Sequence, residues 1–292
     1  MVNEDELTEE AGKAISWWRR IRIWVGYVAF VAALVYGLAN APDEVWRIEP
    51  VWLALAVAVL AVSILFQVLQ VIIFLRCHGI SGEWFVAALF TLRKGVLNVL
   101  LPARSGTLLV LRTLTKRYSL KWYDYVYFSV AASIASLDVS IIAAGFVWLG
   151  WQAGMVLALV SILAAKFIPG YVRLRYLERI GELLLVAAGI YLSFLAGFWC
   201  LINGLGWELT VGQAATFAIA LNLLALVSIT PGNLGVREGL LGVVAPLLSL
   251  PISVGILVGA CFYVLRLLVS SVFLAALECI EVRRASSGSL TK

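Results

Sequence analysis

The sequence predicts an all-α integral membrane protein, and three observations support this fold class. Of its 292 residues, 63% are hydrophobic and 13% are charged, whereas soluble domains have about 45–50% and about 25%. The mean hydropathy is +1.00. The apolar residues also form runs long enough to cross a bilayer core, which takes about 20 helical residues. We expect one membrane domain at 21–278, between cytoplasmic segments at 1–20 and 279–292.

Six apolar runs have the length of a spanning helix. The first follows an acidic N-terminus, MVNEDELTEEAGK, which lacks the basic and then apolar order of a cleaved signal. We therefore expect this run to remain as an anchor, and the other five to cross in turn. The runs are Ile21–Ala39, Val51–Leu75, Tyr125–Leu149, Ala153–Ile168, Leu183–Ile202 and Ile252–Leu277.

Two further apolar regions, 84–114 and 213–250, do not fit single spanning helices. Positive charge helps to place them, because cytoplasmic loops collect Lys and Arg. If 84–114 crossed once, the basic loop at 116–121 would lie outside, whereas a re-entrant hairpin keeps it inside. The same reasoning predicts a hairpin that enters from the outside at 213–250. Both termini then lie on the cytoplasmic side of the plasma membrane. Eight plain transmembrane helices are the alternative.

The expected tips of the two hairpins share a local pattern. They read PARSG at 102–106 and PGNLG at 231–235. Proline removes a backbone donor and glycine tolerates unusual backbone, so both stretches are predicted to interrupt a helix. Unwound backbone is tolerated at membrane depth only beside protein or a wet cavity. Paired interruptions therefore point to a central binding site, although each could instead be a loop between two full crossings.

Basic residues outnumber acidic ones at the predicted membrane depth. A charge at the bilayer centre costs at least ~2.5–3.5 kcal/mol, so each needs a partner, a cavity or a function. The excess of cations predicts an anionic ligand, and guanidinium groups suit a phosphate. Helix N-termini expected near Ser105 and Leu234 would add positive potential. The basic residues are Arg93, Lys94, Arg104, Arg112, Arg237 and Arg266, and the acids are Asp138 and Glu238.

Individual polar residues are open to different interpretations. The hydroxyls of Ser105 and Thr107 would serve the first helix end, and Asn233 would cap the second.

Arg93 and Lys94 could instead reach the cytoplasmic headgroups. Arg266 could pair with Asp138 or Glu238 rather than with a ligand. Asp138 fits a counter-ion better than a proton carrier, and small neighbours suggest that it faces protein.

Other kinds of function find little support in the sequence. Most basic residues flank apolar runs, a pattern typical of topology and lipid headgroups rather than nucleic-acid binding. The four cysteines have no metal-like spacing. The single histidine, His78, lies in a predicted turn, and catalytic or nucleotide-binding motifs are missing. We therefore expect no metal, no cofactor and no enzymatic activity.

Two motifs resemble a known family. NVLLPARSGTLLVLRTL at 98–114 and ITPGNLGVREGLL at 229–241, followed by a helix that carries an arginine, resemble the lysylphosphatidylglycerol synthase transmembrane family. This family includes the flippase-like domain of MprF-type proteins. The likeness runs from about Phe74 to Leu277. The positions that carry it are Asn98, Pro102, Arg104, Gly106, Arg112, Asp138, Pro231, Gly232, Gly235, Glu238 and Arg266.

The resemblance implies the handling of lipids with charged or phosphate-bearing headgroups across the cytoplasmic membrane. The chain departs from the family pattern at Thr107, often Glu, at Asn233, often Gly, and at Ala135, commonly Arg. MprF-type proteins add a soluble aminoacyl transferase, whereas only a short tail follows the last predicted helix here, so we expect transport rather than synthesis.

The expectation is therefore a lipid flippase whose substrate is a phospholipid or a polyprenyl phosphate. The alternatives are a membrane enzyme acting on a lipid phosphate, with Glu238 or Asp138 as base, and a non-transporting partner of a lipid synthase. Besides the lipid, the expected partners are further copies of this chain in a homo-oligomer or a lipid-synthesis enzyme. Expected headgroup contacts are Asn98, Arg104, Ser105, Gly106, Thr107, Arg112, Pro231, Gly232, Asn233, Gly235, Arg237, Glu238 and Arg266.

Overall fold

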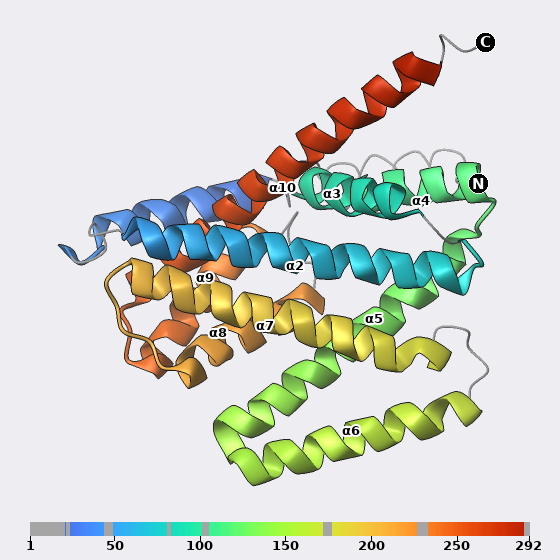
Figure 1. Ribbon diagram of the computed structural model, residues 1–292. Coiled ribbons are helices and arrows are strands. Elements are labelled where there is room, and N and C mark those ends of the chain that lie inside the picture. Colours follow the sequence, from blue (N-terminus) through green and yellow to red (C-terminus); the bar gives the residue numbers. More distant parts are fainter. Residues whose placement is uncertain are drawn as a thin grey trace, which may run out of the picture.

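The protein is a helical bundle with the composition of a membrane protein (Figure 1). The structure, a computed structural model, describes residues 21, 24–43, 49–80, 83–100, 105–171, 177–226 and 233–288, and these include no strand. The predicted all-α class is thus confirmed. The helices long and apolar enough to cross a membrane are Pro50–Cys77, Trp122–Leu149, Ile180–Gly204 and Ile252–Arg283; shorter apolar helices are Trp24–Ala39, Trp151–Ala164 and Val211–Leu224.

The helix boundaries follow local sequence signals. Pro50 occupies the first turn of α2, where its missing N–H is not needed. Gly79, at φ +74°, follows the end of this helix, and Gly150, at φ +93°, allows the turn into α6. The elements after Trp24–Ala39 are α2 Pro50–Cys77, α3 Trp84–Leu100, α4 Ser105–Tyr118, α5 Trp122–Ala144 with a π-helical turn Gly145–Leu149, α6 Trp151–Tyr171, a 3-10 turn Leu177–Arg179, α7 Ile180–Gly204, α8 Val211–Leu226, α9 Val236–Val244, a 3-10 turn Ala245–Leu248 and α10 Ile252–Gly288.

Helices α2 and α7 form an antiparallel pair along the length of the bundle (Figure 1). The amide of Glu49 donates to the carbonyl of Gly204, at 3.1 Å, which places the start of α2 beside the end of α7. In the middle, a Cβ on Gly189 would come within 2.4 Å of the Phe66 ring. Small residues let membrane helices approach closely in this way. α10 crosses the bundle obliquely (Figure 1).

The core consists of two clusters, one toward each end of the bundle. α2 contributes to both, with Leu60 in one cluster and Ile64 in the other. The first cluster joins α2 and α7 to α8, α9 and the start of α10. The second joins α2 and the start of α7 to α3, α4 and α5. The two short-helix pairs α3–α4 and α8–α9 therefore belong to opposite ends.

The pair α3–α4 is a tightly packed hairpin, in the place of the predicted interruption at 84–114. The side chains of Asn98 and Thr107 bond to each other at 3.1 Å, and the amide of Thr107 donates to Asn98 Oδ1 at 3.1 Å. A Cβ on Gly106 would lie 2.6 Å from the carbonyl oxygen of Lys94. Only glycine therefore lets α4 approach α3 so closely.

The pair α8–α9 is the second hairpin, in the place of the predicted interruption at 213–250. Asn233, in the left-handed region at φ +56°, donates its Nδ2 to the carbonyl of Leu224 near the end of α8, at 3.1 Å. Gly235, at φ +77°, precedes α9, and its amide donates to Glu238 Oε2 at 2.8 Å. The N-cap residue of α9 is Gly235 rather than the expected Asn233, and the Glu238 side chain accepts the hydrogen bond of its amide.

Much of the surface is apolar. Several large apolar side chains are strongly exposed: Leu247 is 80% exposed, Leu185 75%, Trp151 70% and Val243 69%. A soluble monomer rarely exposes large continuous apolar patches. This exterior matches hydrocarbon, in agreement with a multi-pass membrane protein.

Candidate cationic cavity

A cavity of about 270 Å³ lies near the middle of the bundle. Helices α2, α3, α9 and α10 form its wall, so both hairpins contribute. At 1.5 Å per residue, Gln67 lies about 25 Å from the start of α2, and Arg266 about 20 Å from the start of α10. The lining residues are Ile64, Gln67, Gln70, Val71, Thr91, Leu92, Lys94, Gly95, Asn98, Arg237, Tyr263, Arg266, Leu267 and Ser270.

The charge of the cavity wall is of one sign. Lys94, Arg237 and Arg266 line it, and its described lining contains no carboxylate. Three cations close together in an apolar bundle repel one another, and the repulsion grows as the surroundings become less polar. An anion in the cavity would relieve it. Three of the six cations that the sequence predicts at membrane depth thus line this cavity.

Arg266 is held by neutral groups. Its Nη2 donates to Gln67 Oε1 on α2, at 3.0 Å. The guanidinium carbon lies 5.3 Å from the centroid of the Phe194 ring on α7, a cation–π distance. No ion pair joins Arg266 to Asp138 or Glu238, although all three are described. The structure therefore does not contain the alternative, a structural ion pair of Arg266 with Asp138 or Glu238. The charge of Arg266 stays available to a ligand.

Arg237 lies over an aromatic ring from α10. Its guanidinium carbon is 4.9 Å from the centroid of the Tyr263 ring, and both residues line the cavity. The Tyr263 hydroxyl is buried, and no described residue forms a hydrogen bond with it. Such a hydroxyl is a donor that an anionic ligand could use.

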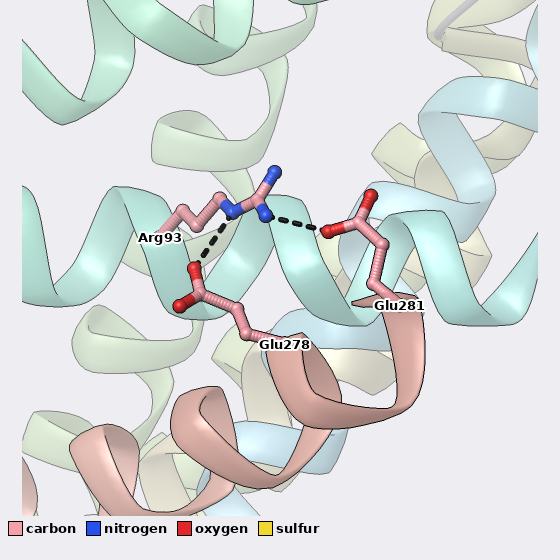
Figure 2. A network of polar contacts seen from close by, with 3 residues as sticks. All are labelled: Arg93, Glu278 and Glu281. Carbon is pink, nitrogen blue, oxygen red and sulfur yellow. Dashed lines mark hydrogen bonds and ion pairs between the residues drawn. The ribbon is translucent and has the colours of Figure 1, made fainter. Parts of the chain in front are cut away.

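Arg93 and Lys94 are neighbours in sequence but serve different surfaces. Lys94 lines the cavity. Arg93 points to the C-terminal part of α10, where its Nε bonds Glu278 Oε1 at 3.1 Å and its Nη2 bonds Glu281 Oε2 at 2.7 Å (Figure 2). Successive residues on a helix do not share a face. The structure therefore assigns Arg93 to an ion-pair network rather than to lipid headgroups.

We expect Arg93→Gln to loosen the end of α10 while leaving the bundle folded. The Arg93 side chain is 30% exposed and its partners 47% and 43%, so solvent screening limits the loss in stability to about 1 kcal/mol or less. Amide exchange in α10 near residues 278–283 should become faster, as measured by mass spectrometry. Lys116→Gln, which removes an exposed cation of α4, is the control. Equal exchange in both variants would contradict a clamping role for Arg93.

Three expected site residues lie away from the cavity. Arg112 is exposed on α4, beside Lys116, at a shallow surface pocket. Asp138 on α5 accepts a hydrogen bond from Ser161 on α6, and no ion pair reaches it from a described residue. Glu238 is fully buried but does not line the cavity, and its Oε2 holds the turn before α9. Arg112 and Asp138 therefore differ from the expectation that they meet the headgroup or neutralise its site, whereas the Glu238 carboxylate still interacts electrostatically with Arg237.

The other motif residues that the structure describes either line the cavity or hold the hairpins together. Asn98 lines the cavity and also joins α3 to α4. Gly106, Thr107, Asn233 and Gly235 hold the hairpins together rather than line the cavity. Outside the described part of the chain lie Pro102, Arg104, Pro231, Gly232 and the side chain of Ser105.

The sequence interpretation missed most neutral polar groups of the cavity. Gln67 and Gln70 lie three residues apart on α2, and Thr91 and Ser270 come from α3 and α10. Residues three apart share a helix face. Two glutamines inside the long apolar run Val51–Leu75 were the signal that could have found this wall.

Comparisons with known proteins give no further identification. No family model, curated protein or solved structure matches the chain. Among the described residues no group of three or more His, Cys, Asp or Glu could hold a metal ion. The free cysteines Cys77, Cys200, Cys261 and Cys279 are dispersed over α2, α7 and α10.

Proposed function

We propose that this chain moves a lipid with an anionic, phosphate-bearing headgroup across the membrane. The observation that carries the proposal is the cavity lined by Lys94, Arg237 and Arg266, with no carboxylate among its described lining residues. A phosphate accepts several charge-assisted hydrogen bonds and would neutralise this wall. The resemblance of the two motifs to the lysylphosphatidylglycerol synthase transmembrane family agrees with this substrate class.

We further propose six spanning helices and two opposed re-entrant hairpins. α3 and α4 have 17 and 14 residues, and α8 and α9 have 16 and 9, all below the about 20 that a crossing needs. The hairpins belong to opposite core clusters, which suits one entering from each leaflet. α6, with 21 residues, and Trp24–Ala39 complete the six crossings. Trp24–Ala39 belongs, like α8, to the shorter apolar helices, so its assignment rests on the apolar run Ile21–Ala39 of the sequence and not on helix length.

The orientation follows from the charges at the two ends. Arg76 and Arg179 border one surface pocket, and His78 lies 3.8 Å from Asp124, so the basic connections before α3, α5 and α7 share an end. The other end has the acidic Glu49 beside the end of α7. Following the positive-inside rule, we propose that the basic end faces the cytoplasm and that the membrane is the plasma membrane.

During transport, the cavity would serve as an intermediate polar binding site for the headgroup. A headgroup that leaves water loses hydration, and the three cations with the amides of Gln67 and Gln70 replace part of it. The chains of the lipid stay in apolar surroundings. Because both hairpins contribute to the wall, a rocking motion of one end against the other would expose the cavity to each leaflet in turn.

The test is leaflet exchange in liposomes that contain the purified protein and a labelled phospholipid or polyprenyl phosphate. A hydrogen bond to a charged group contributes about 1.5–3 kcal/mol, so Arg237→Gln and Arg266→Gln should each slow exchange about tenfold or more. Lys116→Gln, with the same loss of charge at an exposed position of α4, should exchange at the parental rate.

Three results would contradict transport through this cavity. The first is that the parental protein does not accelerate the exchange of any labelled lipid, and the second is that Arg237→Gln and Arg266→Gln exchange lipid as fast as Lys116→Gln. The third is that the protein chemically converts the headgroup in detergent without a bilayer. That result would favour the alternative of a membrane enzyme.

A further inference from the structure

A second, apolar groove of about 290 Å³ lies beside the cationic cavity. Its wall combines the helix Trp24–Ala39, the start of α2, the end of α7 and the middle of α10. Phe30 and Leu34 contribute from the first of these, and Cys261, Val264 and Leu265 from α10. All lining groups are hydrocarbon or thiol, apart from backbone. Val264 is 44% exposed, so the groove reaches the apolar exterior of the bundle.

The groove and the cavity are neighbours on α10. Tyr263 and Arg266 line the cavity, whereas Val264 and Leu265 line the groove. No described residue lines both spaces, but their walls touch through a pair of rings. Phe30, in the groove wall, and Tyr263, in the cavity wall, have their centroids 6.2 Å apart with an angle of 56° between the planes. This contact is within the range of aromatic pairs.

We infer that the groove holds a hydrocarbon chain of the same lipid whose phosphate occupies the cavity, with the Phe30–Tyr263 ring pair between the two parts. This inference rests on the proposed function and extends it. When the headgroup of a lipid binds Arg237 and Arg266, the chains of that lipid have to leave the cavity for an apolar space. The groove is an adjoining apolar space, and it is continuous with the exterior where a chain resides.

The rings fit a passage of this kind. A bound lipid that separates the rings can offset the loss of their contact by burying its chain. The Tyr263 hydroxyl, without a hydrogen bond from a described residue, can donate to a phosphate oxygen. The substrate class is therefore an amphiphile that needs both parts, a phosphate and a long chain.

Cys261 supplies a native probe inside the groove. The variant Cys77→Ala, Cys200→Ala, Cys279→Ala leaves Cys261 as the only thiol. In phosphatidylcholine nanodiscs, dioleoyl phosphatidic acid should make the reaction of Cys261 with N-ethylmaleimide severalfold slower. Dioleoylglycerol, with the same chains and no phosphate, and inorganic phosphate should leave the rate unchanged. Protection should disappear in Arg237→Gln on the same background.

Equal protection by phosphatidic acid and dioleoylglycerol would overturn the inference, because the groove would then take any apolar chain. Native mass spectrometry distinguishes a failure of the proposed groove site from a failure of the proposed function. If the protein retains phosphatidic acid but Cys261 is not protected, the groove is wrong and the proposed function stands. If phosphatidic acid is not retained and no lipid exchange is seen, the proposed function fails as well.

A second measurement uses the unmodified chain, so it does not depend on the cysteine substitutions. Phosphatidic acid with a diazirine near the end of one chain should crosslink to Trp24–Ala39, to the end of α7 and to the middle of α10. Adducts distributed evenly over the apolar exterior, including α5 and α6, would contradict a defined chain site.

Discussion

Gly235→Ala is expected to destabilise the protein strongly. Gly235 has φ +77°, and a Cβ there would lie 2.5 Å from the Cβ of Ala29 and 3.0 Å from the amide nitrogen of Phe30. Backbone strain of about 1–3 kcal/mol adds to overpacking of about 1–3 kcal/mol. The free energy of unfolding should fall by about 2–6 kcal/mol, and the melting temperature in detergent should fall with it.

The matched control for this variant is Gly239→Ala, one turn further along α9. No atom lies within 4 Å of a Cβ at this position, and alanine in a helix interior is favoured over glycine by about 0.5–1 kcal/mol. This variant should melt at or above the parental temperature. If both variants melt together, the close approach of the Gly235 turn to the helix Trp24–Ala39 is wrong.

Gly106→Ala should open the first hairpin. Its Cβ would meet the carbonyl oxygen of Lys94 at 2.6 Å, and Oδ1 and the amide nitrogen of Asn98 at 2.9 and 3.0 Å. Two of these three atoms are α3 backbone, which cannot rotate away, so α4 has to move. The two hydrogen bonds between Asn98 and Thr107 would then be strained or lost, each contributing about 0.5–1.5 kcal/mol.

The expected result is a loss of about 2–4 kcal/mol in stability, visible as a lower melting temperature. Retention of phosphatidic acid in native mass spectrometry should also fall, because α3 carries Lys94 and Asn98 of the cavity wall. Gly95→Ala, on α3 with open space at its Cβ, is the control for melting. A parental melting temperature for Gly106→Ala would contradict the packing of this hairpin.

The class of the protein could be predicted because it depends on composition and run length. Long apolar runs have to lie in hydrocarbon or protein, wherever they pack. The helix pairs at 84–118 and 211–248 were predictable for a related reason. Proline and glycine act on their own backbone, so PARSG and PGNLG predict an interruption without any knowledge of the neighbours.

The cavity could be predicted only in part, because a lining residue depends on how its helix is rotated. Arg237, Arg266 and Asn98 were expected at the site and line it. Arg112 was expected there too but is exposed on α4. Lys94 lines the cavity, whereas one residue earlier Arg93 binds Glu278 and Glu281 (Figure 2).

The sequence by itself determined that the chain is helical, has the composition of a membrane protein, and carries two interrupted regions and an excess of cations within its apolar part. These properties follow from the transfer of each residue out of water and from local backbone preferences. Only the tertiary structure decided which cations share one cavity and that α2 adds its glutamines. It did so through close contacts at Gly106, Gly189 and Gly235, which set the rotation and distance of the helices. Such contacts join residues far apart in the chain, and no local pattern encodes them.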